Sequence, residues 1–157
     1  STHQLGAKVE ECGKCHAYVE GEEDLGFIGI GGPDYDGDGA RDEGTRGEIE
    51  TMREALYQAI QAYAAEMAEA EAIVYDSGSY PYFFIDTDGD GEVDEDEAAF
   101  PNRYNTWTPR LLRAAYNYQY ATKDPGAFAH NGKYILQTLH DTLEDMGVDM
   151  SGMERPE

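Results

Sequence analysis

Two cysteines and one histidine fall within five consecutive residues, Cys12-Gly13-Lys14-Cys15-His16. The chain has no other cysteine and three other histidines. A Cys-x-x-Cys-His sequence is the attachment pattern of c-type haem. Two thiols three positions apart on a turn each add to one vinyl group of the porphyrin, and the adjacent histidine binds the iron. The motif therefore predicts one covalently attached haem, held by Cys12 and Cys15, with His16 as the proximal ligand.

Two other kinds of site use the same residues. A redox-active Cys-x-x-Cys pair normally follows a strand in a βαβ unit, whereas only eleven residues precede Cys12. A structural zinc site usually needs four ligands, and the sequence has no second Cys-x-x-Cys pair. Haem is the favoured interpretation, and zinc binding and thiol redox chemistry remain the alternatives.

A twelve-residue acidic segment, 86–97, matches the calcium-loop pattern D-x-D-x-D-G-x-x-x-x-x-E at every fixed position. In such a loop the carboxylates converge on one cation, the glycine permits a sharp turn, and the last glutamate binds through both oxygens. The predicted calcium ligands are Asp86, Asp88, Asp90, Glu92 through its carbonyl, and Glu97. We call this segment the second acidic loop.

A related segment, 34–45, is called the first acidic loop. Its predicted calcium ligands are Asp34, Asp36, Asp38, Ala40 and Asp42. The twelfth position holds Thr45 in place of the expected glutamate, so Glu43 or Glu48 would have to reach in from another offset. Neither loop has a clear helix before it, so we expect EF-hand-like loops with a structural role, binding one or two calcium ions in all.

The surrounding elements are predicted to be mostly helical. Apolar residues at a 3.6-residue period indicate a helix from about 48 to 72, and Thr45-Arg46-Gly47-Glu48 has the form of a capping box. An aromatic run at 80–85 favours a strand. Helices are predicted at 108–122, which opens with Thr108-Pro109, and at 125–146, which ends before Gly147. The fold class is therefore mostly α, a loop-rich single domain over 1–157 with three main helices.

Charge and hydropathy exclude several classes of partner. The formal net charge is −22, with 33 acidic against 11 basic residues. Such a charge repels nucleic acid and favours basic partners. No stretch has the roughly 20 apolar residues of a membrane-spanning helix. The sequence begins Ser-Thr-His rather than with Met, so we expect a secreted chain whose signal peptide is already removed, in the periplasm or outside the cell.

The sequence after Trp107 resembles the C-terminal part of extracellular and periplasmic multihaem c-type cytochromes. The resemblance rests on Thr108-Pro109-Arg110-Leu111-Leu112-Arg113-Ala114-Ala115-Tyr116-Asn117-Tyr118-Gln119 and on Asp124-Pro125-Gly126-Ala127-Phe128-Ala129-His130-Asn131. Those proteins carry several Cys-x-x-Cys-His motifs, and this chain has one. The resemblance implies that His130 is the distal haem ligand, which makes the iron bis-histidine. His140 and His3 are the alternatives, and five methionines are further possible ligands.

The predicted function is electron transfer by one haem outside the cytoplasm, without transformation of a substrate. The partners are then donor and acceptor proteins or extracellular acceptors. The chain is predicted either as a repeating subunit of an electron-conducting filament or as a soluble periplasmic shuttle. A haem enzyme of peroxidase type is the alternative from another class, and it requires an open sixth iron position. Order in the C-terminal segment 152–157, which has little reason to be ordered in an isolated monomer, would favour the homopolymer.

Overall fold

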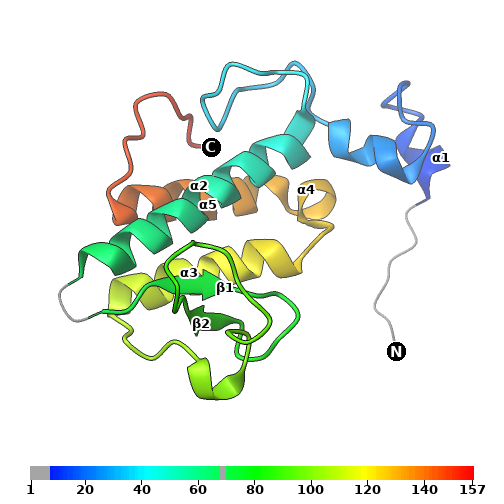
Figure 1. The fold of residues 1–157 in the computed structure, drawn as a ribbon. Helices are drawn as coiled ribbons and strands as arrows, with labels where there is room; N and C mark the ends of the chain where they lie inside the picture. The colour runs from blue at the N-terminus through cyan, green and yellow to red at the C-terminus, as the bar shows by residue number, and fades with distance from the viewer. Residues whose placement is uncertain (1–7, 68–69) are drawn as a thin grey trace.

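The computed structural model describes residues 8–67 and 70–157, which are mostly helical with one small antiparallel sheet. Three long helices form the body of the molecule, and the N-terminal elements lie on its flank (Figure 1). The elements are α1 (Val9–Cys12), the 3-10 helix η1 (Glu22–Phe27), α2 (Gly44–Glu66), β1 (Ile73–Tyr75), β2 (Phe83–Ile85), the 3-10 helix η2 (Phe100–Asn102), α3 (Pro109–Lys123), α4 (Ala127–His130) and α5 (Gly132–Met146).

The hydrophobic core lies where α2, α3 and α5 pack against one another. On each helix the buried apolar side chains recur about every 3.6 residues and so share one face. The fully buried ones include Met52, Leu56 and Ile60 on α2, Leu111 on α3, and Ile135, Leu136, Leu139 and Leu143 on α5. The predicted mostly helical fold with three main helices is confirmed.

Helix α2 differs from its predicted form at both ends. It already begins at Gly44, so Thr45 lies inside the first turn, and the preceding residue makes no side-chain cap. The Glu48 carboxylate instead accepts the N–H groups of Tyr35 and Asp36, at 2.8 and 3.0 Å. The capping-box interpretation is therefore wrong, because the first acidic loop engages Glu48. The helix ends at Glu66 rather than near residue 72, since the chain turns into β1.

The two C-terminal helices are placed as predicted, but the second one is interrupted. The Thr108 hydroxyl caps α3 by accepting the N–H of Leu111 at 3.1 Å. The predicted helix 125–146 is divided into α4 and α5 at Asn131, whose φ of −150° is not helical. Asn and Gly are weak helix formers, and Asn131-Gly132 provides the break. Gly147 ends α5 with a φ of +87°, as expected for a C′ glycine.

A short hairpin joins α2 to the second acidic loop. β1 pairs antiparallel with β2, with Val74 opposite Phe84. The aromatic run at 80–85 thus contains a strand at 83–85, whereas β1 was not predicted. Val74 and Phe84 are fully buried, so the hairpin is fixed to the core and places residue 86 at its end.

The C-terminal segment is held by contacts within the chain. The N–H of Glu154 donates to the Tyr35 carbonyl at 3.1 Å, and Gln137 donates to the Pro156 carbonyl at 3.0 Å. Arg155 binds both oxygens of Asp141, at 2.6 and 2.8 Å. Contacts within one chain therefore hold this segment, so its position does not argue for polymerisation. None of the described helices is both long and apolar enough to cross a membrane.

Candidate haem-attachment and calcium-binding sites

The Cys-x-x-Cys-His motif forms one continuous turn at the end of α1. The N–H groups of Cys15 and His16 both donate to the Cys12 carbonyl, at 3.1 and 3.0 Å. The thiols are not joined in a disulfide; Cys12 is half-buried and Cys15 is exposed. The turn therefore presents two free thiols and an imidazole next to the second thiol, which is the donor set that c-type haem requires.

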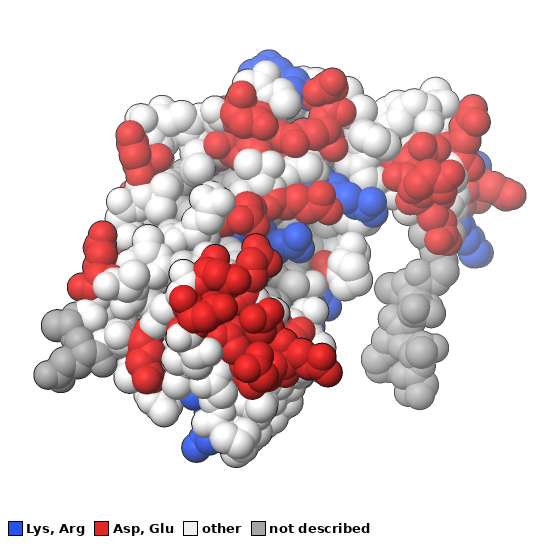
Figure 2. Space-filling view, viewed as in Figure 1, with Lys and Arg blue, Asp and Glu red and all other residues white. Residues whose placement is uncertain are grey.

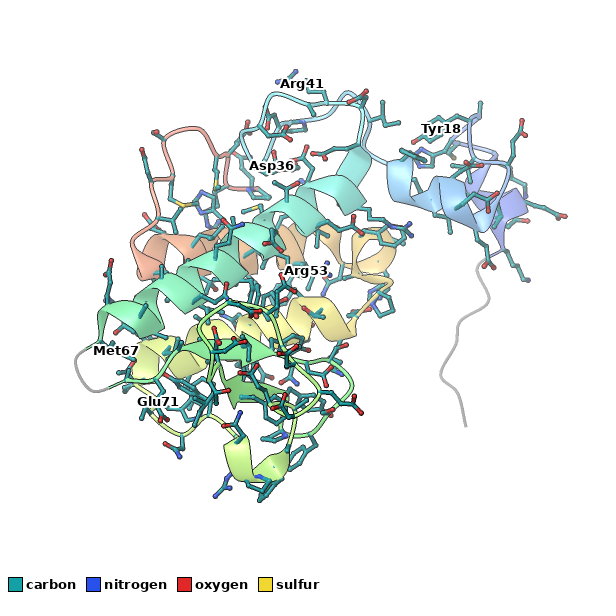
Figure 3. All side chains as sticks on the ribbon, in the orientation of Figure 1. Tyr18, Asp36, Arg41, Arg53, Met67 and Glu71 are labelled. Atoms are coloured by element: carbon teal, nitrogen blue, oxygen red, sulfur yellow. The ribbon has the colours of Figure 1, made fainter. Side chains whose placement is uncertain are left out.

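Aromatic residues connect this turn to η1. The His16 ring meets Tyr18 edge-on, with 6.0 Å between ring centroids. The Tyr18 hydroxyl donates to the Phe27 carbonyl at 3.2 Å, and Figure 3 shows Tyr18 on the N-terminal flank. Tyr18, Phe27 and Ile30 are each nearly half exposed, at 46%, 46% and 47%. A flat apolar cofactor attached to the turn would find exposed apolar side chains on the same flank, so the residues present fit the group.

The two described candidates for a distal ligand have opposite environments. His130, at the end of α4, has a side chain that is 57% exposed, and its Nε2 lies 3.2 Å from Asp124 Oδ1. His140 on α5 is 8% exposed, and its Nδ1 is buried without a hydrogen-bond partner. Helix α4 packs against η1, the element that follows the haem motif. His130 is therefore accessible to a neighbouring group, whereas His140 is not without unpacking α5. His3 lies outside the described residues.

His130 also lines a cavity of about 450 Å³ between the segment 29–35, the start of α2 and the α4–α5 junction. Pro33, Tyr35, Phe128 and Tyr134 supply apolar surface to the same cavity. The residues of the attachment motif do not belong to its lining. The structure thus places His130 on an accessible, partly apolar surface without bringing it into a common cavity with His16.

The second acidic loop has the geometry of a cation-binding turn. Both oxygens of Asp86 accept backbone N–H groups, from Gly89 at 2.6 Å and Gly91 at 3.0 Å. Asp86, Asp88 and Glu97 offer oxygens that lie within 4.8 Å of one another. Asp90 Oδ1 accepts the N–H of the seventh position at 2.8 Å and lies outside that group of three. The loop therefore brings three of its predicted side-chain ligands to one centre.

Glu97 closes this loop from its far end. One oxygen accepts the backbone N–H and the hydroxyl of Thr87, at 2.6 and 2.7 Å, and the other accepts the N–H of Asp94 at 3.2 Å. The side chain is 3% exposed. The hydrogen bond from the Thr87 N–H lowers the pKa of Glu97 below its ordinary value. The carboxylate is therefore held ionised at the position that a bidentate calcium ligand occupies.

Two residues that sequence reasoning missed hold the second acidic loop in place. The Asn102 amide donates to the carbonyls of Ile85 and Glu97, at 2.7 and 3.0 Å, so it joins both ends of the loop. Gln61 on α2 donates to the Gly91 carbonyl at 2.9 Å. Neither residue belongs to the loop motif. No local pattern predicts their role, because each is at least five residues away in sequence from the groups to which it donates.

The first acidic loop repeats the same turn. Both oxygens of Asp34 accept N–H groups, from Gly37 at 2.7 Å and Gly39 at 3.0 Å. Gly37 and Gly39 have φ of +78° and +89°, and their counterparts in the second loop have +78° and +84°. Asp36 and Asp38 each accept the N–H two residues on. The two loops therefore share one backbone conformation over their first seven positions.

The first loop closes with a different carboxylate from that of the second. Its oxygens form two groups within 4.8 Å, one of Asp34, Asp36 and Glu48 and one of Asp36, Asp38 and Glu43. The Glu48 carboxylate accepts the N–H groups of the two residues after Asp34. In the second loop, Glu97 likewise accepts the N–H of the residue after Asp86. Asp42 belongs to neither group. The sequence named Glu43 and Glu48 as possible substitutes, and the structure brings both to the loop.

The carboxylates of the first loop are crowded, and Asp36 Oδ2 and Glu43 Oε1 have no hydrogen-bond donor. Burial, followed by the charges of Asp36, Asp38 and Glu48, raises the pKa of Glu43 to about 7. Burial also raises the pKa of Asp36 and of Glu48 above the ordinary values. Mutual repulsion of this kind is what a bound divalent cation relieves. Figure 2 shows that acidic side chains also gather over the second loop and on the N-terminal flank.

Comparison with known proteins gives partial matches of one kind. The chain is 27% identical over 104 residues to the C-type polyheme cytochrome OmcB of Geobacter sulfurreducens, covering 58% of this chain and 14% of that protein. It is 26% identical over 97 residues to OmcC of the same species, covering 54% of this chain and 13% of OmcC. Part of the chain thus resembles part of a multihaem c-type cytochrome, and it spans about one seventh of the length of these relatives. No family model and no solved structure matches the chain.

Proposed function

We propose that this chain is a c-type cytochrome domain that carries electrons through one haem attached at Cys12 and Cys15. The observation that supports this most directly is the 12–16 turn, with two free thiols and an adjacent imidazole, in a chain that resembles polyhaem cytochromes. When bound, the haem supplies an iron that cycles between Fe(III) and Fe(II). The chain contains one such motif, so we propose one haem per chain.

The residues of the chain then have distinct roles. Cys12 and Cys15 would attach the haem covalently, and His16 would bind its iron. His130 is proposed as the second histidine ligand, because it is an exposed histidine on the element that packs against η1. Two histidine ligands give a lower potential than a histidine and a methionine. Ligation by both histidines would leave no open iron position, which the peroxidase alternative needs.

The charge of the chain indicates the partners and the site of action. A net charge of −22 steers positively charged proteins and cations toward the surface. Covalent haem attachment, as in the cytochromes that the chain resembles, implies assembly outside the cytoplasm. We therefore propose a periplasmic or extracellular carrier with basic donors and acceptors. Calcium in the two acidic loops would offset four of the 22 excess charges and stabilise the fold.

Assembly into a homopolymer is a further part of this proposal. Its support is the single haem motif of the chain in a sequence that resembles polyhaem cytochromes. Assembly of one-haem subunits would place their haems in a row, which one subunit alone does not provide. The soluble shuttle is the competing state. Negative-stain microscopy with and without calcium distinguishes them, because a uniform small particle under both conditions contradicts assembly.

The attachment itself is tested by a pyridine haemochrome spectrum and by mass spectrometry of the denatured chain. We expect a c-type spectrum and a mass increased by one haem. Replacement of both Cys12 and Cys15 with Ser should abolish covalent haem. A colourless chain that contains zinc, or a chain whose two cysteines cycle between dithiol and disulfide, would contradict the proposal. Carbon monoxide binding to the reduced protein would favour the peroxidase alternative, since it requires an open iron position.

A further inference from the structure

The first acidic loop contains buried carboxylate oxygens that lack donors. Asp36 is 5% exposed, and its Oδ2 is fully buried without a hydrogen-bond partner, as is Oε1 of Glu43. The two carboxylates belong to the same group of oxygens within 4.8 Å. Figure 3 shows Asp36 on the inner side of the loop, facing α2, and Arg41 on the outer side. A buried carboxylate oxygen without a donor is costly unless a cation compensates it.

The basic residues of the chain do not supply that cation. Among residues 8–67 and 70–157, the ion pairs of lysine and arginine involve Glu11, Asp141 and Asp145, and none involves the first acidic loop or Glu48. The nearby Arg46 guanidinium lies over the Phe128 ring, 4.3 Å from its centre. The oxygens form two groups of three that share Asp36. They are hard ligands, and three carboxylates in either group exceed the one or two that magnesium usually takes. The chemistry of the site therefore favours calcium.

The other side of the same loop carries the C-terminal segment. The Tyr35 carbonyl accepts the N–H of Glu154 at 3.1 Å. The backbone of Gly37 lies so close to Gly152 that a Cβ at position 37 would be 2.2 Å from the Gly152 carbonyl oxygen. Figure 1 shows the C-terminal coil running beside this loop. The segment thus contacts Tyr35, between Asp34 and Asp36, and Gly37, between Asp36 and Asp38.

We propose that Glu43 and Glu48, together with Asp34, Asp36 and Asp38, complete a calcium site, and that the ion bound there holds segment 150–157 against the body. The inference rests on the proposed calcium binding of this loop and adds its closing ligands and its effect. Glu48 follows Asp34 by fourteen residues, whereas Glu97 follows Asp86 by eleven. The first turn of α2 accommodates the three additional residues and places Glu48 beside the loop.

The ligand assignment is tested by counting calcium ions on the full haem-loaded chain by isothermal titration. We expect two ions for the wild type and one for Glu43→Gln and for Glu48→Gln. Glu43→Gln is the cleaner variant, because the oxygen it changes has no donor, whereas Glu48 also accepts two backbone N–H groups. Glu50→Gln is the matched control, since it removes one exposed charge from the same helix and should still bind two ions.

The effect on the tail is tested by hydrogen exchange of the Glu154 amide. If segment 150–157 detaches only when the ion is absent, calcium slows exchange of this amide by a factor of 1 + [Ca²⁺]/Kd. The slowing is about a hundredfold at a free calcium concentration of 100 times Kd. Glu97→Gln should keep this response, and Glu43→Gln should lose it. Two ions on both loop variants, or the same exchange rate with and without calcium, would overturn the inference. If only the second loop binds calcium, this inference fails and the proposed function stands. If neither loop binds calcium, the proposed role of calcium fails as well. The haem proposal is tested separately, by its spectrum.

Discussion

Replacement of Glu97 with Gln separates the effect of calcium from the effect of hydrogen bonding in the second acidic loop. Three donors converge on the Glu97 carboxylate at 2.6, 2.7 and 3.2 Å. Gln keeps one carbonyl oxygen to accept from Thr87 but removes the charge. A hydrogen bond to a charged group contributes about 1.5–3 kcal/mol and a neutral one about 0.5–1.5 kcal/mol. Both Thr87 bonds then weaken by about 1 kcal/mol each, and the Asp94 N–H loses its carboxylate acceptor, which costs about 1.5–3 kcal/mol. Without calcium, the variant should therefore lose about 3–5 kcal/mol of unfolding free energy.

Calcium should increase the difference in unfolding free energy between the wild type and Glu97→Gln. An ion that binds only the folded chain adds about 2.7 kcal/mol at 100 times its Kd, and Glu97→Gln should lose that increment at the second loop. The assay is urea unfolding followed by circular dichroism, once in excess chelator and once in calcium. Glu95→Gln is the control, because Glu95 is exposed and the charge change is the same. If Glu97→Gln gains as much stability from calcium as the control does, the second loop does not bind the ion through Glu97.

Three other predictions follow from individual contacts. His130→Ala should leave the reduced haem able to bind carbon monoxide with little change in thermal stability, whereas His140→Ala should lower stability and leave the haem spectrum unchanged. Asn102→Ala removes the amide that joins both ends of the second acidic loop; it should cost about 1–3 kcal/mol of unfolding free energy and weaken calcium binding, as measured by titration. Arg155→Gln should speed amide exchange in the C-terminal segment. The hydrogen bond from Arg155 lowers the pKa of Asp141 below its ordinary 3.8, so in the wild type this contact should persist above that pH and loosen only as the pH falls through the lower folded-state value.

Sequence reasoning succeeded where one short segment determines its own conformation. Thr108-Pro109 marks the start of α3 and Gly147 the end of α5, because a cap and a left-handed glycine act within one turn. The turn of the second acidic loop likewise depends on residues inside the loop. These signals need no knowledge of the rest of the chain.

It failed where distant segments compete for one residue. The Thr45–Glu48 pattern is typical of a capping box, but loop amides at positions 35 and 36 take the Glu48 carboxylate. β1 has three residues, and it exists because it pairs with β2 and buries Val74. The break at Asn131 was hidden by the apolar periodicity that continues through α4 and α5. In each case tertiary contacts override a local preference.

The start of α2 joins the two proposed kinds of site. Gly44, the first residue of α2, has a φ of +70°, and a Cβ there would lie 2.7 Å from the backbone of Phe27 at the end of η1. The next amide donates to the Ile28 carbonyl at 2.9 Å. One turn later, Glu48 reaches the first acidic loop. Since η1 follows the proposed haem-attachment turn, an ion at this loop would stabilise the same helical turn that contacts the N-terminal flank. The core of α2, α3 and α5 is held by apolar burial and does not need the ion. Calcium should therefore act on the N-terminal flank and the C-terminal segment more strongly than on the helical content of the body.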